Sequence, residues 1–295
     1  MEVIVKNEFL KVSNLTKYYG DILGVKDVSF SLNNGEIFGF IGPNGSGKST
    51  TIKCIMNLIN KNEGTIQIDG KTFDKKDYIL KELIGYLPSE IHLYDDLTVE
   101  KMLDFHETFY KKNIHDRRLE LVKRLKLDQS KKIEELSLGN LKKLGIVLAF
   151  MHQPKLIILD EPTSGLDPVM QQEFYELLKE EKAKGTTIFY STHVLSEISK
   201  ICDRVGIIKE GKLLQIETIE ELLNKNLIYV TIESEDIDNI IEDLKISSDL
   251  KTGNKIKFKN TLSTDLLIKT ISKYKIDKLL IEEATIEDLL LCYYK

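Results

Sequence analysis

The sequence predicts an α/β fold built around a parallel β-sheet, followed by a smaller α+β domain. Three apolar runs, at 156–159, 187–190 and 205–208, have the character of strands that are buried on both faces. A glycine-rich loop at 42–50 follows a further apolar run and precedes a helix-like segment, which is the strand, loop, helix order of such sheets. Beyond Ile216 glycines become rare and short strands alternate with helical stretches, which indicates a second domain.

The N-terminal part predicts strands at 9–12 and 28–32, with a turn at Asn33-Asn34-Gly35 before the apolar run that leads into the glycine loop. Tyr19 stands just before Gly20, between the two strands. Its ring can stack on a purine base, or it can be an ordinary tyrosine of an edge strand. The hexapeptide alone leaves both interpretations open.

The glycine loop matches the pattern G-x-x-x-x-G-K-[ST] in the strand-to-helix context that this pattern requires. Glycines allow successive backbone N–H groups to turn inward around an anion, and the following helix adds its positive end. Lys48 would then reach the β- and γ-phosphates of a nucleotide, and the Ser49 hydroxyl would bind Mg²⁺. The alternative is a glycine-rich turn with an incidental lysine. The candidate nucleotide-binding residues are Gly42, Pro43, Asn44, Gly45, Ser46, Gly47, Lys48, Ser49 and Thr50.

The middle of the chain predicts a strand and turn at 64–70 and a strand at 83–87 that ends at Pro88-Ser89-Glu90. Thr98 has the position of an N-cap for a helix that extends to about Tyr110. A helix rich in Lys and Arg follows at about 116–127, and its charges indicate a solvated face. Another helix is expected at 141–151, where Pro154 prevents its continuation.

Composition and charge exclude several classes of protein. The chain has 295 residues, 42% of them apolar, and a net charge of −5, which argues against a general nucleic-acid binder. Its three cysteines are far apart without metal spacing, which predicts reduced thiols. Charges interrupt the apolar residues of the first ten positions, so no signal peptide is expected there. No apolar run approaches the length of a membrane helix. A role at a membrane would therefore need a partner.

Five motifs in order make the chain recognisable: residues 42–50, 136–140, 156–161 and 164–167, and His193. Together they resemble the ATPase subunits of ABC transporters over about residues 9–217. The C-terminal segment that includes residues 281–289 is similar to the small appendix of bacterial exporter ATPases of the drug, antibiotic or peptide efflux type.

This resemblance implies a P-loop NTPase core at 1–217 with an antiparallel β subdomain and a helical subdomain at about 89–152. It also implies an accessory α+β domain at 218–295. The expected ligands are ATP and Mg²⁺. Asp160 would hold Mg²⁺ through water, Glu161 would activate the attacking water, and His193 would hydrogen-bond the γ-phosphate. Tyr19 matches the family's adenine-stacking position.

The segment that contains Ser137, Gly139 and Asn140 would cap the γ-phosphate that a second subunit binds, so the resemblance implies a head-to-tail dimer with two sandwiched ATP molecules. Residues 164–167 would link the two sites. The family's usual Leu-Ser-Gly-Gly-Gln has Leu138 in place of its first glycine here and Asn140 in place of glutamine. Leu138 is therefore expected to point away from the nucleotide. Ser89 stands where the family has a Mg²⁺-contacting glutamine, which predicts modest turnover.

The leading hypothesis is the ATPase subunit of an exporter, at the cytoplasmic face of the membrane through a membrane-spanning permease. The permease would dock near Ser89 and residues 93–110. No nucleic-acid partner is expected, because the chain has a single cassette and no long coiled coil. The alternative is a soluble or regulatory ABC ATPase with weak hydrolysis, and the departures at Leu138 and Ser89 keep it open.

Overall fold

The computed structural model describes residues 8–223, 228–247, 251–260 and 262–283. The chain separates into two compact units, Met1–Ile219 and Glu220–Lys295. The sequence also predicts a helix at 286–293 with a capping box at 285–288, and both lie outside the described residues.

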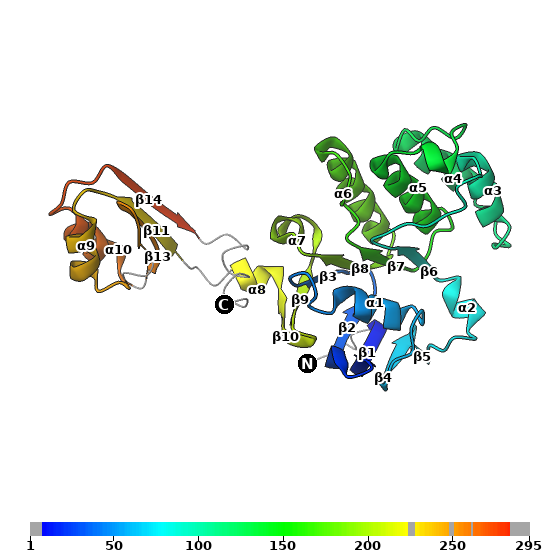
Figure 1. The fold of residues 1–295 in the computed structure, drawn as a ribbon, viewed down its shortest axis with the longest axis horizontal. Coiled ribbons are helices and arrows are strands. Elements are labelled where there is room, and N and C mark those ends of the chain that lie inside the picture. Colours follow the sequence, from blue (N-terminus) through cyan, green and yellow to red (C-terminus); the bar gives the residue numbers. More distant parts are fainter. Residues whose placement is uncertain (1–7, 224–227, 248–250, 261, 284–295) are drawn as a thin grey trace, which may run out of the picture. The chain divides into compact units, whose positions relative to one another are not determined.

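A mostly parallel sheet forms the centre of the first unit (Figure 1). Its strands β6, β7, β8, β3 and β9 run parallel, and β10 closes one edge antiparallel to β9. All side chains of β3, β7 and β8 are buried, as the continuous apolar runs predict. In spatial order the strands are β10 (Lys212–Thr218), β9 (Arg204–Lys209), β3 (Ile37–Ile41), β8 (Thr187–Thr192), β7 (Leu156–Asp160) and β6 (Ile84–Leu87).

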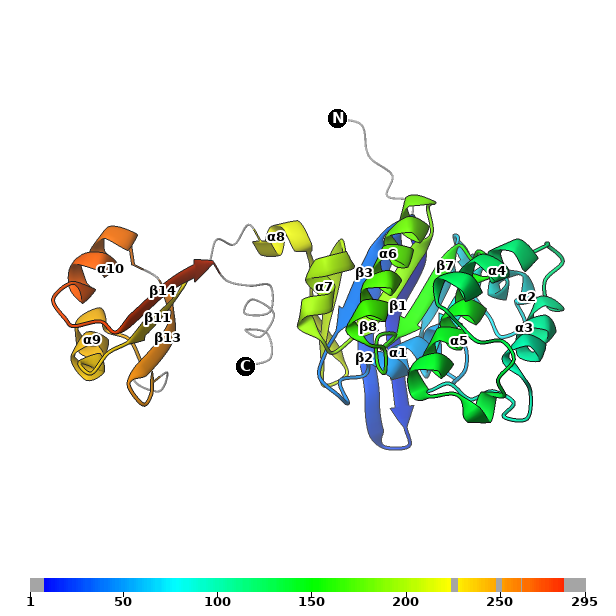
Figure 2. The ribbon, with the colours of Figure 1, turned by 90° about the horizontal axis from the view of Figure 1, so that it is seen from above.

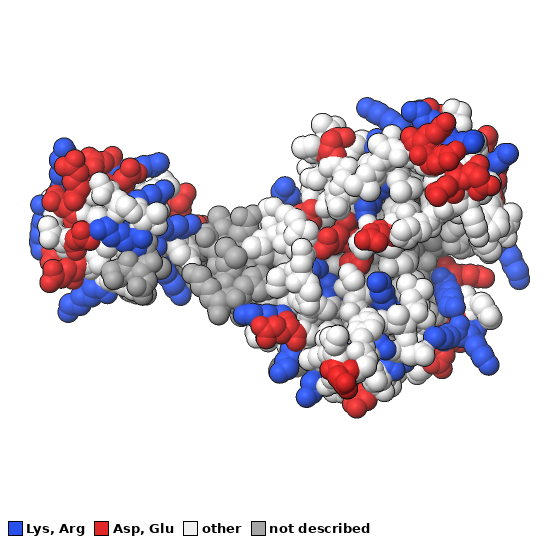
Figure 3. Space-filling model, in the orientation of Figure 1, with Lys and Arg blue, Asp and Glu red and all other residues white. Residues whose placement is uncertain are grey.

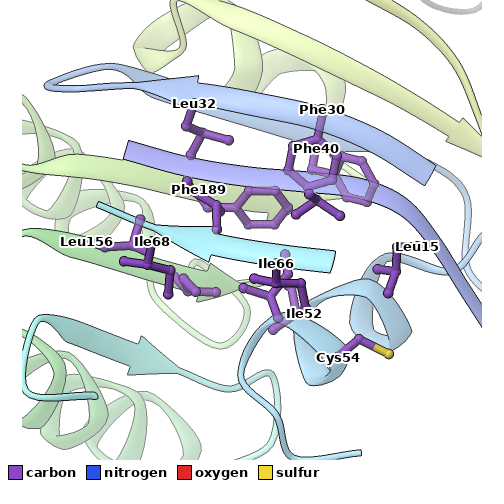
Figure 4. Close-up of a cluster of buried hydrophobic side chains, with 14 of the residues drawn as sticks. Leu15, Phe30, Leu32, Phe40, Ile52, Cys54, Ile66, Ile68, Leu156 and Phe189 are labelled. Atoms are coloured by element: carbon purple, nitrogen blue, oxygen red, sulfur yellow. The ribbon is translucent and has the colours of Figure 1, made fainter. Parts of the chain in front are cut away.

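An antiparallel sheet of β1 (Glu8–Tyr19), β2 (Ile22–Asn33), β4 (Glu63–Ile68) and β5 (Lys71–Thr72) packs against one face of the parallel sheet. The hairpin strands β1 and β2 are longer than predicted, and Tyr19 is the last residue of β1 rather than part of a connecting loop. Between the sheets, Phe30, Phe40 and Phe189 form one aromatic cluster with centroid separations of 5.3 to 5.6 Å (Figure 4). Helix α1 (Lys48–Ile55) adds Ile52 and Cys54 to this core.

Helices α5 and α6 cover the other face of the parallel sheet (Figures 1 and 2). Helix α5 (Leu138–Phe150) begins three residues before the predicted start at 141, because Ser137 is its N-cap and accepts a hydrogen bond from the Asn140 N–H. Helix α6 (Pro168–Ala183) was not predicted; Asp167 caps it, and Pro168 occupies its first turn. Helix α7 (Leu195–Ile201) follows β8.

The segment between β6 and α5 is helical. Helix α3 (Val99–Glu107) has Thr98 as its N-cap, as predicted. Helix α4 (His115–Arg124) carries basic residues, and two of them form ion pairs with α6. The buried Arg117 contacts Glu181 at 2.6 Å, and Arg124 contacts Glu173 and Glu180 at 2.5 Å each. The charged face of this helix, which was predicted to be solvated, is therefore partly paired with α6. The remaining short helices are α2 (Tyr78–Lys81), η1 (Ile133–Glu135) and α8 (Ile219–Leu223).

The second unit contains its own antiparallel sheet and core. In spatial order its strands are β12 (Lys251–Thr252), β13 (Lys255–Asn260), β11 (Ile228–Glu233) and β14 (Lys278–Glu283). Helices α9 (Ile237–Leu244) and α10 (Thr264–Ile271) bury one apolar stripe each, and these stripes pack with Val230, Ile232 and Phe258. The apolar face of α9 is thus covered within its own unit.

Acidic and basic side chains are interspersed over the face shown in Figure 3. Among the described residues, no helix combines the length and the apolar character that crossing a membrane requires.

Candidate functional site

Three adjacent strands, β3, β8 and β7, bring the predicted catalytic residues together. The strands are parallel, so their carboxyl ends meet at one edge of the sheet. The glycine loop leaves β3, His193 follows β8, and Glu161 follows β7. The order β3-β8-β7 therefore places His193 between the other two groups.

The glycine loop has the backbone of an anion cradle. Gly45 and Gly47 have φ angles of 79° and 108°, which only glycine adopts freely. A Cβ at Gly42 would lie 2.3 Å from the Ile208 carbonyl oxygen, so the turn has no room for a side chain. Helix α1 begins at Lys48 without a side-chain cap, which leaves its first N–H groups to another acceptor. A phosphate would supply that acceptor.

Lys48 lies folded within this loop and is 5% exposed. Its Nζ donates to the carbonyl oxygens of Gly42 at 2.7 Å and Pro43 at 3.2 Å. The same Nζ is 3.9 Å from Glu161 Oε1. Burial lowers the pKa of the Lys48 ammonium, and the carboxylates of Glu161 and Asp160 oppose that shift.

Glu161 and His193 contact each other directly. His193 Nδ1 and Glu161 Oε1 are 3.0 Å apart, and both side chains are partly exposed, 46% and 25% respectively. Glu161 has a φ of 48°, an uncommon value for a residue with a side chain. Beside it, Asp160 is 1% exposed and its Oδ1 accepts a hydrogen bond from the Ser191 hydroxyl at 3.0 Å. The arrangement joins a carboxylate, an imidazole and an ammonium group.

A cavity of about 360 Å³ opens beside the loop. Tyr19 stands at its rim, 46% exposed, and its hydroxyl is 3.5 Å from Thr50 Oγ1. Lys17 Nζ lies 5.1 Å from the centre of the Tyr19 ring. Glu161 reaches the same cavity from β7. The cavity is lined by Tyr19, Ile22, Leu23, Gly24, Asn44, Gly45, Gly47, Lys48, Ser49, Thr50 and Glu161.

These residues fit a nucleoside triphosphate with a hard divalent cation. The Ser46 hydroxyl oxygen is buried without a hydrogen-bond partner, although buried hydroxyls normally have one. The uncapped start of α1 offers further donors, and Lys48 supplies a positive charge. Ser49 and Asp160 are oxygen donors of the kind that Mg²⁺ prefers. An anion with an attached Mg²⁺ would satisfy all of these groups.

Comparison with known proteins settles the family. Residues 25–164 match the ABC transporter family model. The chain is 38% identical over 73% of its length to the linearmycin resistance ATP-binding protein LnrL of Bacillus subtilis, of which it covers 71%. It is 38% identical over 77% of its length to the bacitracin transport ATP-binding protein BcrA of Bacillus licheniformis, of which it covers 75%. The chain belongs to the ABC transporter ATP-binding proteins.

A solved structure agrees with this assignment. The dimeric structure of MJ0796, a bacterial ABC transporter cassette, superimposes with a TM-score of 0.66 at 27% identity and covers 71% of this chain and 98% of that one. The fold expectation of an ABC ATPase core is thus confirmed. The protein is an ATP-hydrolysing subunit of the exporter type, and the alternative without a link to transport is not favoured.

The segment 137–140 of this ABC protein lies at the N-terminus of α5. Leu138 is 66% exposed and packs on the neighbouring loop: a Cβ at Gly165 would lie 3.0 Å from Leu138 Cγ. A Cβ at Gly139 would lie 2.9 Å from the Gly165 carbonyl oxygen. The segment 137–140 and the loop 164–167 therefore pack on each other within one chain.

Ser89 does not line the cavity of the glycine loop. It is exposed and lies with Leu138 at a separate cavity of about 180 Å³. Two of the departures from the family's pattern, Leu138 and Ser89, are therefore neighbours, although some fifty positions separate them in the sequence. The role of Ser89 as a Mg²⁺ ligand stays a prediction.

A buried carboxylate that no sequence motif marks, Glu197, supports two of the site's loops. Glu197, 4% exposed, accepts hydrogen bonds from hydroxyl groups on three elements. Two of the donors, Thr163 and Thr192, precede the loop 164–167 and His193 respectively. The donors are Thr163, Tyr175, Tyr190 and Thr192, at 2.5, 3.3, 2.9 and 2.6 Å.

Proposed function

We propose that this subunit hydrolyses ATP at the glycine-loop cavity to drive export of an antibiotic, a peptide or a related compound through a separate permease. The contact of Glu161 with both His193 and Lys48 at the rim of the cradle is the observation that carries the proposal. The relatives named for linearmycin resistance and bacitracin transport support the substrate class.

In the proposed site, Lys48 leaves its two carbonyl partners, or shares them, to neutralise the β- and γ-phosphates. The N–H groups of residues 42–50 surround the phosphates, and the Tyr19 ring stacks on adenine. Ser49 and Asp160 hold Mg²⁺, with Ser89 as a further ligand through water. These are oxygen ligands, and Mg²⁺ keeps much of its hydration.

Glu161 is the proposed general base. Its carboxylate polarises the attacking water in line with the γ-phosphate, while His193 hydrogen-bonds the phosphate and holds the carboxylate at 3.0 Å. Both side chains are partly exposed, so water can reach them.

Ser137, Gly139 and Asn140 lie at the start of α5 rather than around the cradle of their own chain. We propose that they cap the γ-phosphate held by a second subunit in a head-to-tail dimer. Ser137 already accepts the Asn140 N–H, and the start of a helix favours a nearby anion. The proposed location is the cytoplasmic face of the membrane, through the permease.

The test compares ATP hydrolysis by the wild-type protein and by Glu161→Gln, with Glu176→Gln on the exposed side of α6 as the matched control. We expect Glu161→Gln to lower kcat by about 10²- to 10⁴-fold, the range for loss of a general base, while ATP binding is retained. Equal rates for the wild type and Glu161→Gln, with nucleotide still bound, would refute the catalytic assignment.

The transport part needs a separate experiment. The permease that co-purifies with this subunit is reconstituted with it in vesicles, and export of bacitracin is measured with ATP. Transport that persists with Glu161→Gln at the wild-type rate would separate hydrolysis from export. Transport of lipids or ions instead of the antibiotic would contradict the substrate class.

A further inference from the structure

Lys142 on helix α5 places a positive charge inside the protein. Its side chain is 2% exposed. The Nζ donates to three main-chain carbonyl oxygens: Ser89 at 3.0 Å, Pro88 at 3.4 Å and Glu161 at 3.4 Å. An ammonium group has three N–H donors, so each can be directed at one of these carbonyls.

The three carbonyls belong to two loops that the sequence separates widely. Pro88 and Ser89 follow β6, and Glu161 follows β7, the neighbouring strand of the parallel sheet. Lys142 enters between these loops from the first turns of α5. One side chain thus links helix α5, whose first turn includes the segment 137–140, to the loop at Ser89 and to the backbone of the proposed general base.

Glu161 needs such support because its backbone is in a sparsely populated conformation. With a φ of 48°, a residue with a side chain persists only when neighbouring contacts hold it. Its N–H donates to the Ser191 carbonyl at 3.0 Å, and its carbonyl accepts from Lys142. Both sides of the residue are therefore fixed, and its carboxylate is free to contact His193.

Electrostatics agree with this position. Burial lowers the pKa of the Lys142 ammonium, while the charges of Asp160 and Glu161 raise it. The lysine therefore lies in the field of both carboxylates without a direct ion pair to either, so the carboxylate oxygens remain available for Mg²⁺ and water.

A second contact holds the Ser89 loop on the same helix. Gly145 lies one turn after Lys142, and a Cβ there would come within 2.5 Å of Ile91 Cδ1 and 2.7 Å of Leu87 Cδ1. The absence of a side chain at Gly145 lets the loop 88–91 lie close to α5 beside the ammonium group.

We propose that Lys142 is a positioning residue for hydrolysis. It fixes the backbone of Glu161 and makes the position of its carboxylate depend on the loop at Ser89. This inference rests on the proposed function, because it acts through Glu161. Movement of the Ser89 loop would then reach the water-activating group through one shared hydrogen-bond donor.

The first test is steady-state ATP hydrolysis by Lys142→Met, which removes the charge and the donors at similar length. We expect kcat to fall by about 10²-fold, the cost of displacing a catalytic group by about 1 Å, with the Kd for ATP within about threefold of wild type. Lys142→Arg keeps a donating cation and is expected to recover most of the rate. Lys143→Met, at the partly buried next position, is the matched control and should keep it.

The deciding test is a double-mutant cycle with Glu161→Gln, measured in single turnovers. If Lys142 acts through Glu161, Lys142→Met should lower the rate little further in the Glu161→Gln background. The proposal would be overturned if the double variant lost the product of the two single rate reductions. It would also be overturned if Lys142→Met lost ATP affinity and Lys142→Arg did not restore it. If Lys142→Met does not fold, Lys142→Gln, neutral but still a donor, takes its place in the cycle.

The result separates the two proposals. Should Glu161→Gln hydrolyse ATP like the wild type, the proposed function fails. Should Glu161→Gln be slow while Lys142→Met is as fast as Lys143→Met, only the positioning role fails.

Discussion

A buried histidine makes the first unit sensitive to acid. His152 is 6% exposed, and its Nε2 lies 3.1 Å from the Ile84 carbonyl oxygen. The ring stacks on Tyr110 at 4.5 Å, and His106 and Lys112 are nearby. Burial, with a smaller contribution from His106, lowers the pKa of His152 from 6.5 to about 4. Burial also lowers the pKa of His106.

The direction in which stability changes with pH follows from proton binding. Between pH 6.5 and about 4 the unfolded chain protonates His152 while the folded protein does not, so unfolding takes up a proton. The stability contribution is fully present above 6.5 and is lost as the pH falls toward 4. The full shift corresponds to about 3 kcal/mol, and about 2 kcal/mol of it is lost by about pH 5. That is a large share of the total of about 5–15 kcal/mol for a typical protein.

The assay is urea unfolding followed by circular dichroism at about pH 7.5 and about pH 5 for the wild type and His152→Gln. Glutamine can still donate to the Ile84 carbonyl, but it does not titrate. We expect the loss of unfolding free energy at the lower pH to be about 2 kcal/mol smaller in the variant. His92→Gln, at a histidine whose side chain is 86% exposed, should leave the loss unchanged. If the unfolding free energy of His152→Gln falls as much at the lower pH as that of the wild type, the role assigned to His152 is wrong.

Three further variants test other parts of the first unit. Lys48→Ala should abolish hydrolysis and weaken ATP binding, because backbone dipoles alone do not neutralise the phosphates; wild-type affinity by calorimetry would contradict this role. Arg117→Ala leaves the buried Glu181 with Lys184 as its remaining cationic partner, at 2.8 Å, and should lower the unfolding free energy in urea by about 3 kcal/mol. Gly165→Ala places a Cβ at a φ of 82° and 3.0 Å from the side chain of Leu138, and should lower the unfolding free energy in urea by more than the roughly 1 kcal/mol that the left-handed backbone conformation costs by itself.

The parts of the fold that the sequence predicted well are those with strong local signals. The buried strands β7 and β8 show unbroken apolar runs, and the glycine loop has few alternative uses. Helix α6 was not predicted, although Asp167 caps it and Pro168 lies in its first turn. The start of α5 was placed too late since Gly139 and Asn140 disfavour helix, while the Ser137 cap outweighs them.

The residues of the candidate site also differ in how strongly the sequence marks them. Lys48, Glu161 and His193 could be proposed from the sequence because each belongs to a motif whose spacing reflects its place at a strand end. Lys142 had no such mark: a lysine in the first turns of a helix is ordinarily solvated. Only the packing of α5 against the loops after β6 and β7 shows that its ammonium group is buried. Tertiary neighbours, which one sequence does not display, decide such cases.

The order of the strands explains why the departures at Leu138 and Ser89 leave the proposed catalytic groups in place. Lys48, His193 and Glu161 depend on β3, β8 and β7, whose pairing and burial involve neither departure. Both departures lie instead on the side of β6 and α5, at one small cavity. Lys142 lines that cavity and also contacts the Glu161 backbone, so we expect it to transmit changes at Leu138 and Ser89 to the proposed catalytic carboxylate. Leu138→Gly and Ser89→Gln, which introduce the family's usual residues, should therefore alter kcat through Lys142. The same substitutions should have little effect on kcat in a Lys142→Met background.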